Sequence, residues 1–171
     1  MVELKEQNFE KNKQTYLNLE KNLKTLLGED VPIDHVGSTA IPNMCGKNII
    51  DILVGAKTKM QFEALKILIS GEGYFASQNS KTEIYQFFAS RQGETGEGDV
   101  HIHLVIMETD RYNDFLTLRD YLLKNPKEAI NYSNHKKELV NIGVIDRKEY
   151  RRIKSEYVSK LIERARENKG Q

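Results

Sequence analysis

The stretch that decides the fold is DHVGSTAIPNMCGKNIIDILVG, residues 34–55. Its first residues continue an apolar run from Val31 and predict a short strand that ends at Val36, just before Gly37. Residues 48–54, NIIDILV, form a nearly continuous apolar and β-branched run, which is typical of a strand covered on both faces. We therefore expect two strands joined through a Gly-Ser-Thr turn, with one carboxylate inside the second strand.

The segments on either side add helices and further strands. Between the strands predicted over residues 82–89 and 99–107 lies the polar, Gly-rich segment RQGETGEGD, which suits a hairpin connection. The order of elements predicts an α+β or mixed α/β fold, in which a mixed sheet is flanked by helices and more helices follow at the C-terminal end. Helical spacing of apolar residues predicts helices that begin near Phe9, Thr58, Thr109, Pro126 and Asp146. Three more strands are predicted over residues 74–77, 82–89 and 99–107.

The composition bounds the class of protein. The chain has 171 residues, 39% of them apolar and 30% charged, with a formal net charge of +1. We expect one globular domain over residues 1–171, without a membrane span or an apolar signal segment. The near-neutral charge gives no support to nucleic-acid or membrane partners. The single cysteine, Cys45, fits a reducing compartment, so we expect a cytoplasmic protein.

The turn Gly37-Ser38-Thr39 is the first candidate for chemistry. A glycine directly after a strand lets the backbone approach a ligand closely. The N–H groups that follow it, with the Ser38 and Thr39 hydroxyls, are suited to phosphate oxygens. An ordinary turn with a hydroxyl cap is the alternative interpretation.

Asp51 and two histidines are the second candidate. Asp51 lies between apolar neighbours on an interior strand, where a carboxylate must be paired, hydrogen-bonded, metal-bound or placed at a strand end beside solvent. His101 and His103 in DVHIHLVIM are two residues apart on a strand and therefore point to the same face. Two imidazoles and a carboxylate suit a transition metal or an anionic ligand. A solvated sheet face that carries two histidines is the simpler alternative.

Four basic residues are candidates for an anion site. Arg119 and Lys154 share the apolar stripes of their helices, which indicates either snorkelling side chains or a partly buried anion site. Lys47 and Arg91 are weaker candidates for the same site. By contrast, the pairs Lys136-Lys137 and Arg151-Arg152 are expected on solvated helix faces.

Several separated motifs together resemble the GrpB family of small bacterial proteins. They are HVGSTAIP, GKNIIDILV, HIHLVI, FLTLRDYLLKNP and YRRIKSEYV, which cover most of the chain in the same order. The resemblance implies the fold of the nucleotidyltransferase (polymerase-beta-like) superfamily and a nucleotide-related ligand. It also implies that Gly37 and Ser38 hold phosphate, and that Asp51 is one of the carboxylates that hold two Mg²⁺ ions for in-line transfer.

The sequence departs from the superfamily pattern at two places. Leu53 occupies the position of the second carboxylate, and the later strand offers His101 and His103 in place of a third. Mg²⁺ prefers oxygen ligands, so this set suits Zn²⁺, Mn²⁺ or a metal-free phosphate pocket better than two Mg²⁺ ions.

Three hypotheses follow. The first is a nucleotidyltransferase-like protein that binds a nucleotide or another phosphorylated small molecule, with Asp51 and His103 as catalytic residues. Its ligand would be held by Gly37, Ser38, Thr39, Lys47, Arg91, Arg119 and Lys154. The second is a non-catalytic binding module of the same fold. The third is a hydrolase dependent on a transition metal held by Asp51, His101 and His103.

Overall fold

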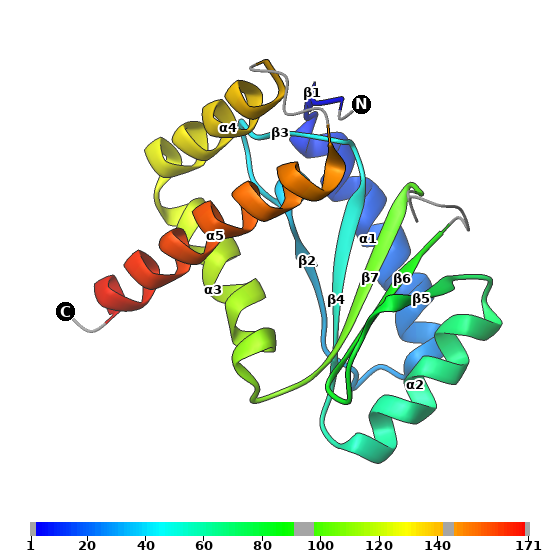
Figure 1. Ribbon diagram of the computed structural model, residues 1–171. Helices are drawn as coiled ribbons and strands as arrows, with labels where there is room; N and C mark the ends of the chain where they lie inside the picture. Colours follow the sequence, from blue (N-terminus) through cyan, green and yellow to red (C-terminus); the bar gives the residue numbers. More distant parts are fainter. Residues whose placement is uncertain (1–2, 91–97, 142–145, 170–171) are drawn as a thin grey trace.

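The computed structural model describes residues 3–90, 98–141 and 146–169. A five-stranded mixed sheet runs through its centre, in the order β2-β4-β7-β6-β5 (Figure 1). The strands are β2 (Ile33–Val36), β4 (Ile50–Ala56), β5 (Phe75–Lys81), β6 (Tyr85–Ala89) and β7 (Val100–Ile106). Two short strands, β1 (Lys5–Glu6) and β3 (Cys45–Gly46), pair with each other outside this sheet. The helices are α1 (Phe9–Leu27), α2 (Lys59–Gly71), α3 (Asp110–Lys124), α4 (Pro126–Asn141) and α5 (Arg147–Lys169).

The centre of the sheet is the parallel pair β4 and β7, and the other pairings are antiparallel. In this register Asp51 is opposite His101, and Leu53 is opposite His103. Residues opposite each other on neighbouring strands project from the same face. The pairing therefore brings the Asp51 carboxylate and both imidazoles together on one face of the sheet.

The opposite face of the sheet carries the main core. Ile52, Ile102 and Leu104 are completely buried there, together with Phe62 and Ile69 of α2. Helices α1 and α2 cover this face, as Figure 1 shows, and α1 adds Leu23 to the same cluster. Every second residue of β4 and β7, beginning with Ile50 and Val100, is aliphatic, so one face is wholly apolar while the other is not.

The C-terminal helices form a second layer on the other face. Helix α3 packs on β2 and β7, while α4 and α5 pack mainly on α3 and on each other (Figure 1). A separate apolar cluster joins these helices to the loop after β2. It contains Ile41 and Met44 from that loop, Leu122 from α3 and Leu161 from α5. The loop that carries the Gly-Ser-Thr turn is thereby fixed against the C-terminal helices.

The predicted fold class and element order are confirmed, with differences in detail. Strand β5 extends to Lys81 and has an irregular register, and β6 begins at Tyr85 rather than Thr82. The antiparallel pairing of β6 with β7 agrees with the predicted hairpin, although residues 91–97 of its connection lie outside the described residues. Strands β1 and β3 were not predicted, because two-residue strands have no periodicity. None of the helices in the described ranges combines the length and apolar character needed to cross a membrane.

Candidate ligand-binding cleft

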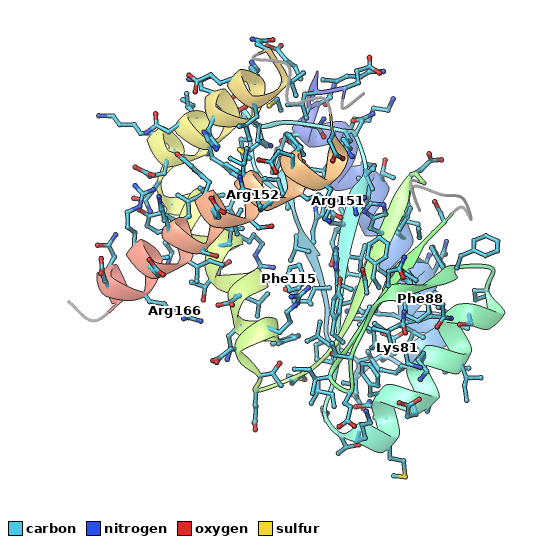
Figure 2. The ribbon with its side chains drawn as sticks, viewed as in Figure 1. Lys81, Phe88, Phe115, Arg151, Arg152 and Arg166 are labelled. Atoms are coloured by element: carbon cyan, nitrogen blue, oxygen red, sulfur yellow. The ribbon has the colours of Figure 1, made fainter. Side chains whose placement is uncertain are left out.

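A cleft of about 910 Å³ opens on the sheet face that carries Asp51. Strands β4, β6 and β7 form its floor, and helices α3, α4 and α5 form its walls. In Figure 2, Phe115 of α3 lies between that helix and the strands, and Arg151 lies on the end of α5 nearest the strands. The side chains that matter most below are Asp51, Tyr85, His101 and His103 on the floor and Lys136 and Lys154 on the walls.

The Asp51 carboxylate is held by both histidines through one oxygen. His101 Nδ1 lies 3.2 Å and His103 Nε2 lies 3.4 Å from Asp51 Oδ1. Burial by itself would raise the pKa of Asp51, but the hydrogen bonds from His101 and His103 outweigh it and hold that pKa well below its usual range. Asp51 is therefore ionised at neutral pH, and an ionised carboxylate only accepts hydrogen bonds. Both histidines must donate to it.

The orientation of His103 is fixed on its other side by Tyr85. The Tyr85 hydroxyl lies 3.0 Å from His103 Nδ1. Since Nε2 donates to Asp51, Nδ1 of a neutral imidazole accepts from Tyr85. The Phe115 ring packs on the imidazole, with 4.7 Å between the ring centroids. His101 differs, because its Nε2 is buried and has no hydrogen-bond partner among the residues that the structure describes.

Two glycines allow the turn after β2 to close on the floor. Gly37 has φ of 73°, and a Cβ there would lie 2.3 Å from Asp51 Oδ2. A Cβ on Gly46 would lie 2.3 Å from Ser38 Oγ. Gly37 therefore supplies both a backbone angle that favours glycine and the space that the carboxylate occupies. The structure places Gly37 and Ser38 beside Asp51 in the cleft, as the sequence motif suggested.

Thr39 lies elsewhere, and its predicted contact with a ligand is wrong. Its side chain is completely buried and does not line the cleft. The Thr39 hydroxyl lies 2.9 Å from His35 Nε2 and donates to the Ile49 carbonyl at 3.3 Å. The short 3₁₀ turn over Ser38–Ala40 turns this residue inward, so Thr39 secures the loop rather than facing a ligand.

Two lysines of the C-terminal helices reach the cleft. Lys136 of α4 is 4% exposed, and its ammonium group donates to the Cys45 carbonyl and lies 4.9 Å from the Tyr132 ring centroid. Burial lowers the pKa of Lys136 to about 8. The prediction that Lys136 lies on a solvated face is wrong, because α4 packs with this side against β3. The solvated position of the pair Lys136-Lys137 was predicted from the local sequence, which does not show where a helix packs.

Lys154 of α5 is partly buried in the cleft wall. Among the described residues it has neither a hydrogen-bond nor an ion-pair partner. Burial lowers the pKa of Lys154, Asp51 raises it, and the nearby charges of Lys47 and Arg151 lower it further. The Lys154 ammonium thus lies among like charges, at a place where an anion would relieve both burial and repulsion.

The remaining basic candidates differ in where they lie and in what they contact. Arg119 lines the cleft, but its guanidinium donates to Asp34 at 2.8 Å and to Asp120 at 2.8 Å. Lys47 also lines the cleft, whereas Arg91 lies outside the described residues. The sequence analysis missed Arg111, whose guanidinium lies 4.2 Å from the Tyr85 ring centroid, as well as Tyr85, Lys136 and Arg151. No local motif marks any of these four residues.

The donor set does not fit a pair of Mg²⁺ ions. Leu53, at the position where the resemblance predicted a second carboxylate, is completely buried with Val36, Val105 and Tyr112 beneath α3. Apolar packing thus fills the space that a second metal ligand would need. Within the described ranges, no group of three His, Cys, Asp or Glu side chains is arranged to hold a metal ion. A transition metal at Asp51, His101 and His103 stays a prediction, and no chemical step below depends on one.

The fold and the cleft define the class: a protein with a nucleotidyltransferase-like fold. The structure superposes on Cid1, which has RNA terminal uridylyl transferase activity, with a TM-score of 0.50 and 13% identity, over 75% of this chain and 38% of the other. A cytoplasmic RNA terminal U-transferase gives a TM-score of 0.50 at 12% identity, over 77% and 41% of the two chains. At these identities the likeness shows the fold alone.

Within this class the chain belongs to the GrpB family, whose sequence model, described as GrpB protein, matches residues 2–164. Glutamate-rich protein GrpB of Alkalihalophilus pseudofirmus is 31% identical over 143 residues, which are 82% of each chain. A UPF0157 protein of Pseudomonas aeruginosa is 34% identical over 78% of this chain, which spans only 54% of that relative's length. The crystal structure of GrpB from Enterococcus faecalis gives a TM-score of 0.82 at 23% identity, covering 99% of this chain and 100% of that one. The family predicted from the motifs is confirmed.

Proposed function

We propose that this protein binds a phosphorylated small molecule in the cleft, and that a nucleotide is the first ligand to test. The observation that carries the proposal is Lys154, an ammonium group in the wall of a concave site without a hydrogen-bond or ion-pair partner among the described residues. Removing a charge from water without a partner is unfavourable, and a bound anion offsets that cost. The lowered pKa of Lys154 has this origin.

The surroundings of Lys154 favour a polyanion over a single carboxylate. Lys47, Arg111, Lys136 and Arg151 line the same cleft. Asp114 also lines it but is paired with Arg166 at 2.5 Å, so it does not balance these cations. A phosphate group offers several acceptor oxygens and up to two negative charges, which suits convergent lysine and arginine side chains.

The floor of the cleft supports a nucleotide as the first choice. Phe87 and Phe115 present aromatic rings beside His103, with centroid separations from the imidazole of 5.5 Å and 4.7 Å. Such rings pack well against a base. The uridylyl transferase activity of Cid1, which shares the fold, also makes a nucleotide a reasonable ligand. Because the donor set does not fit two Mg²⁺ ions, the proposal is restricted to binding.

Calorimetric titration of ATP and of inorganic pyrophosphate into the purified protein tests the proposal. We expect binding by the wild type and a loss of at least about tenfold in affinity for Lys154→Met, which keeps the length of the side chain and removes its charge. Lys160→Met is the matched control, since Lys160 is exposed on the same helix and does not line the cleft. Equal affinities for Lys154→Met and the wild type would overturn the proposal, as would an absence of binding at millimolar concentrations.

A further inference from the structure

The carboxylate of Asp51 has one oxygen that the protein does not use. Both histidines donate to Oδ1. Oδ2 has no hydrogen-bond partner in the described part of the chain. It is not among the fully buried atoms that lack a partner, so it keeps some exposure to solvent. It lies against the backbone of Gly37, whose missing Cβ leaves room for the carboxylate. Because Asp51 lines the cleft, Oδ2 is an acceptor that a ligand can reach.

This acceptor and the Lys154 ammonium line the same cleft from different elements, β4 and α5. The two groups do not form an ion pair, yet the charge of Asp51 raises the pKa of Lys154. They are thus close enough to interact across the cleft without touching. A ligand that satisfies both must carry an anionic group at one end and a hydrogen-bond donor at the other.

We propose, resting on the function proposed above, that the ligand is a hydroxylated phosphate ester whose phosphate binds at Lys136 and Lys154 and whose hydroxyl donates to Asp51 Oδ2. A hydroxyl suits this place better than an ammonium group. Lys47, Arg111, Lys136, Arg151 and Lys154 make the surroundings of the cleft positive, which opposes a second cation. Asp51 is thereby a specificity residue that contacts the ligand directly, and the two histidines hold its carboxylate in position.

Replacing Asp51 by Asn gives a sharp test, because the histidines dictate how the amide lies. His101 Nδ1–H and His103 Nε2–H both need an acceptor, so the Asn oxygen takes the place of Oδ1. The amide NH₂ then falls where Oδ2 was, and an acceptor becomes a donor. A ligand hydroxyl can then only accept a neutral hydrogen bond from the amide, in place of the stronger charge-assisted bond that it donates to a carboxylate. A ligand without that hydroxyl loses nothing and gains from the removal of a negative charge.

The experiment compares ATP with 2′,3′-dideoxy-ATP, which differs only by its missing ribose hydroxyls, on wild type, Asp51→Asn and Lys154→Met. We expect the wild type to prefer ATP by about tenfold. Asp51→Asn should reduce the preference to about threefold or less by weakening ATP binding only, and Lys154→Met should weaken both nucleotides and keep the preference. Thermal unfolding of each variant verifies that it is folded.

The outcomes separate this inference from the function on which it rests. Wild-type protein that binds both nucleotides equally overturns the inference without any need for a variant. A preference for ATP that stays at its wild-type size in folded Asp51→Asn also overturns it. In both cases weaker binding by Lys154→Met still supports the phosphate site. If neither nucleotide binds, or if Lys154→Met binds both as the wild type does, the proposed function fails and the inference fails with it.

Discussion

The two faces of the β4–β7 pair are built from alternate residues of the same two strands, and they differ completely in chemistry. One face presents Ile52, Ile102 and Leu104 to helices α1 and α2, without any exposure to solvent. The other presents Asp51, which is hydrogen-bonded to two histidines, to an open cleft. The face toward α1 and α2 therefore stabilises the fold, while the opposite face of the same sheet lines the cleft. A substitution on the cleft face need not disturb the packing of the core face.

The cleft face is itself divided. Asp51 and Leu53 are two residues apart on β4 and point the same way, but Asp51 is in the cleft and Leu53 is sealed beneath α3. Val105 and Tyr112 close the space around Leu53. The boundary between the binding surface and the core therefore lies between Asp51 and Leu53, which are successive residues on the same face of β4. The predictions below probe that boundary first and then the charges that line the cleft.

The largest effect is expected for Leu53→Asp, which places a carboxylate at the position where the resemblance predicted one. The new side chain would be buried among Val36, Val105 and Tyr112 without a partner. We expect a loss of at least about 4 kcal/mol in the free energy of unfolding, from lost packing and the buried carboxyl group. Urea denaturation measures this loss. Leu53→Met, which conserves volume, should cost less than about 1.5 kcal/mol. A stable Leu53→Asp protein that binds Mg²⁺ would show that the position belongs to the site.

Gly37→Ala is expected to have the next largest effect. The new Cβ would meet Asp51 Oδ2 at 2.3 Å, in a backbone conformation with φ of 73°. We expect a loss of about 2–4 kcal/mol in the free energy of unfolding and a weaker site. Gly71→Ala is the control, because a Cβ there has no neighbour within 4 Å. Since Gly71 ends helix α2, alanine should be neutral or stabilise by up to about 1 kcal/mol. Similar losses for the two variants would contradict this explanation.

The floor of the site could be predicted from the sequence, for a physical reason. A strand repeats every two residues, so the spacing of His101 and His103 was enough to place both on one face, as the structure has them. The apolar neighbours of Asp51 likewise indicated an interior strand. Periodicity does not state which strands pair, however. The contact of Asp51 with both histidines depends on the register of β4 with β7, which only the folded chain shows.

The walls of the cleft could not be predicted in the same way. Lys136 and Arg151 come from helices whose docking depends on contacts distant in sequence, such as the donation from Lys136 to the Cys45 carbonyl. For Arg119 the stripe position left a snorkelling side chain and an anion site as alternatives, and its partner Asp34 lies 85 residues away. A helix pattern thus gives the direction of a side chain and leaves its partner undetermined.

A smaller effect, of opposite sign, is expected for the stability of Lys154→Met. The methionine keeps the apolar stem and removes an ammonium group that burial and neighbouring cations disfavour. We expect the variant to be more stable by about 1 kcal/mol at neutral pH, although it binds ligand less well. The measurement is the midpoint of urea denaturation, compared at an unchanged dependence of the unfolding free energy on urea concentration. Lys160→Met, on the exposed side of α5, should leave the midpoint unchanged. A lower midpoint for Lys154→Met would mean that its charge stabilises the fold.

The smallest effect concerns pH and reports on Lys136. Its pKa is lowered to about 8, so the folded protein releases this proton at lower pH than the unfolded chain, where the ordinary value of 10.5 applies. The unfolded state then binds more protons between these values, and stability should rise with pH in that window. Phosphate binding should change in the opposite direction, because it needs the charged form.

Between about pH 7.5 and about pH 9 the charged fraction of a group with a pKa of about 8 falls about eightfold, so we expect the affinity for ATP to fall by about that factor, as measured by titration calorimetry. The charged and titratable groups that act on Lys136 are Cys45, Asp51 and Lys154 from the packed elements and Tyr132 and Lys137 from α4. Lys136→Met should flatten the profile, and any slope that remains reports on Lys154, whose pKa is also lowered. A wild-type profile that is flat over this range would mean that the Lys136 charge does not act on the ligand and serves only to hold β3 against α4.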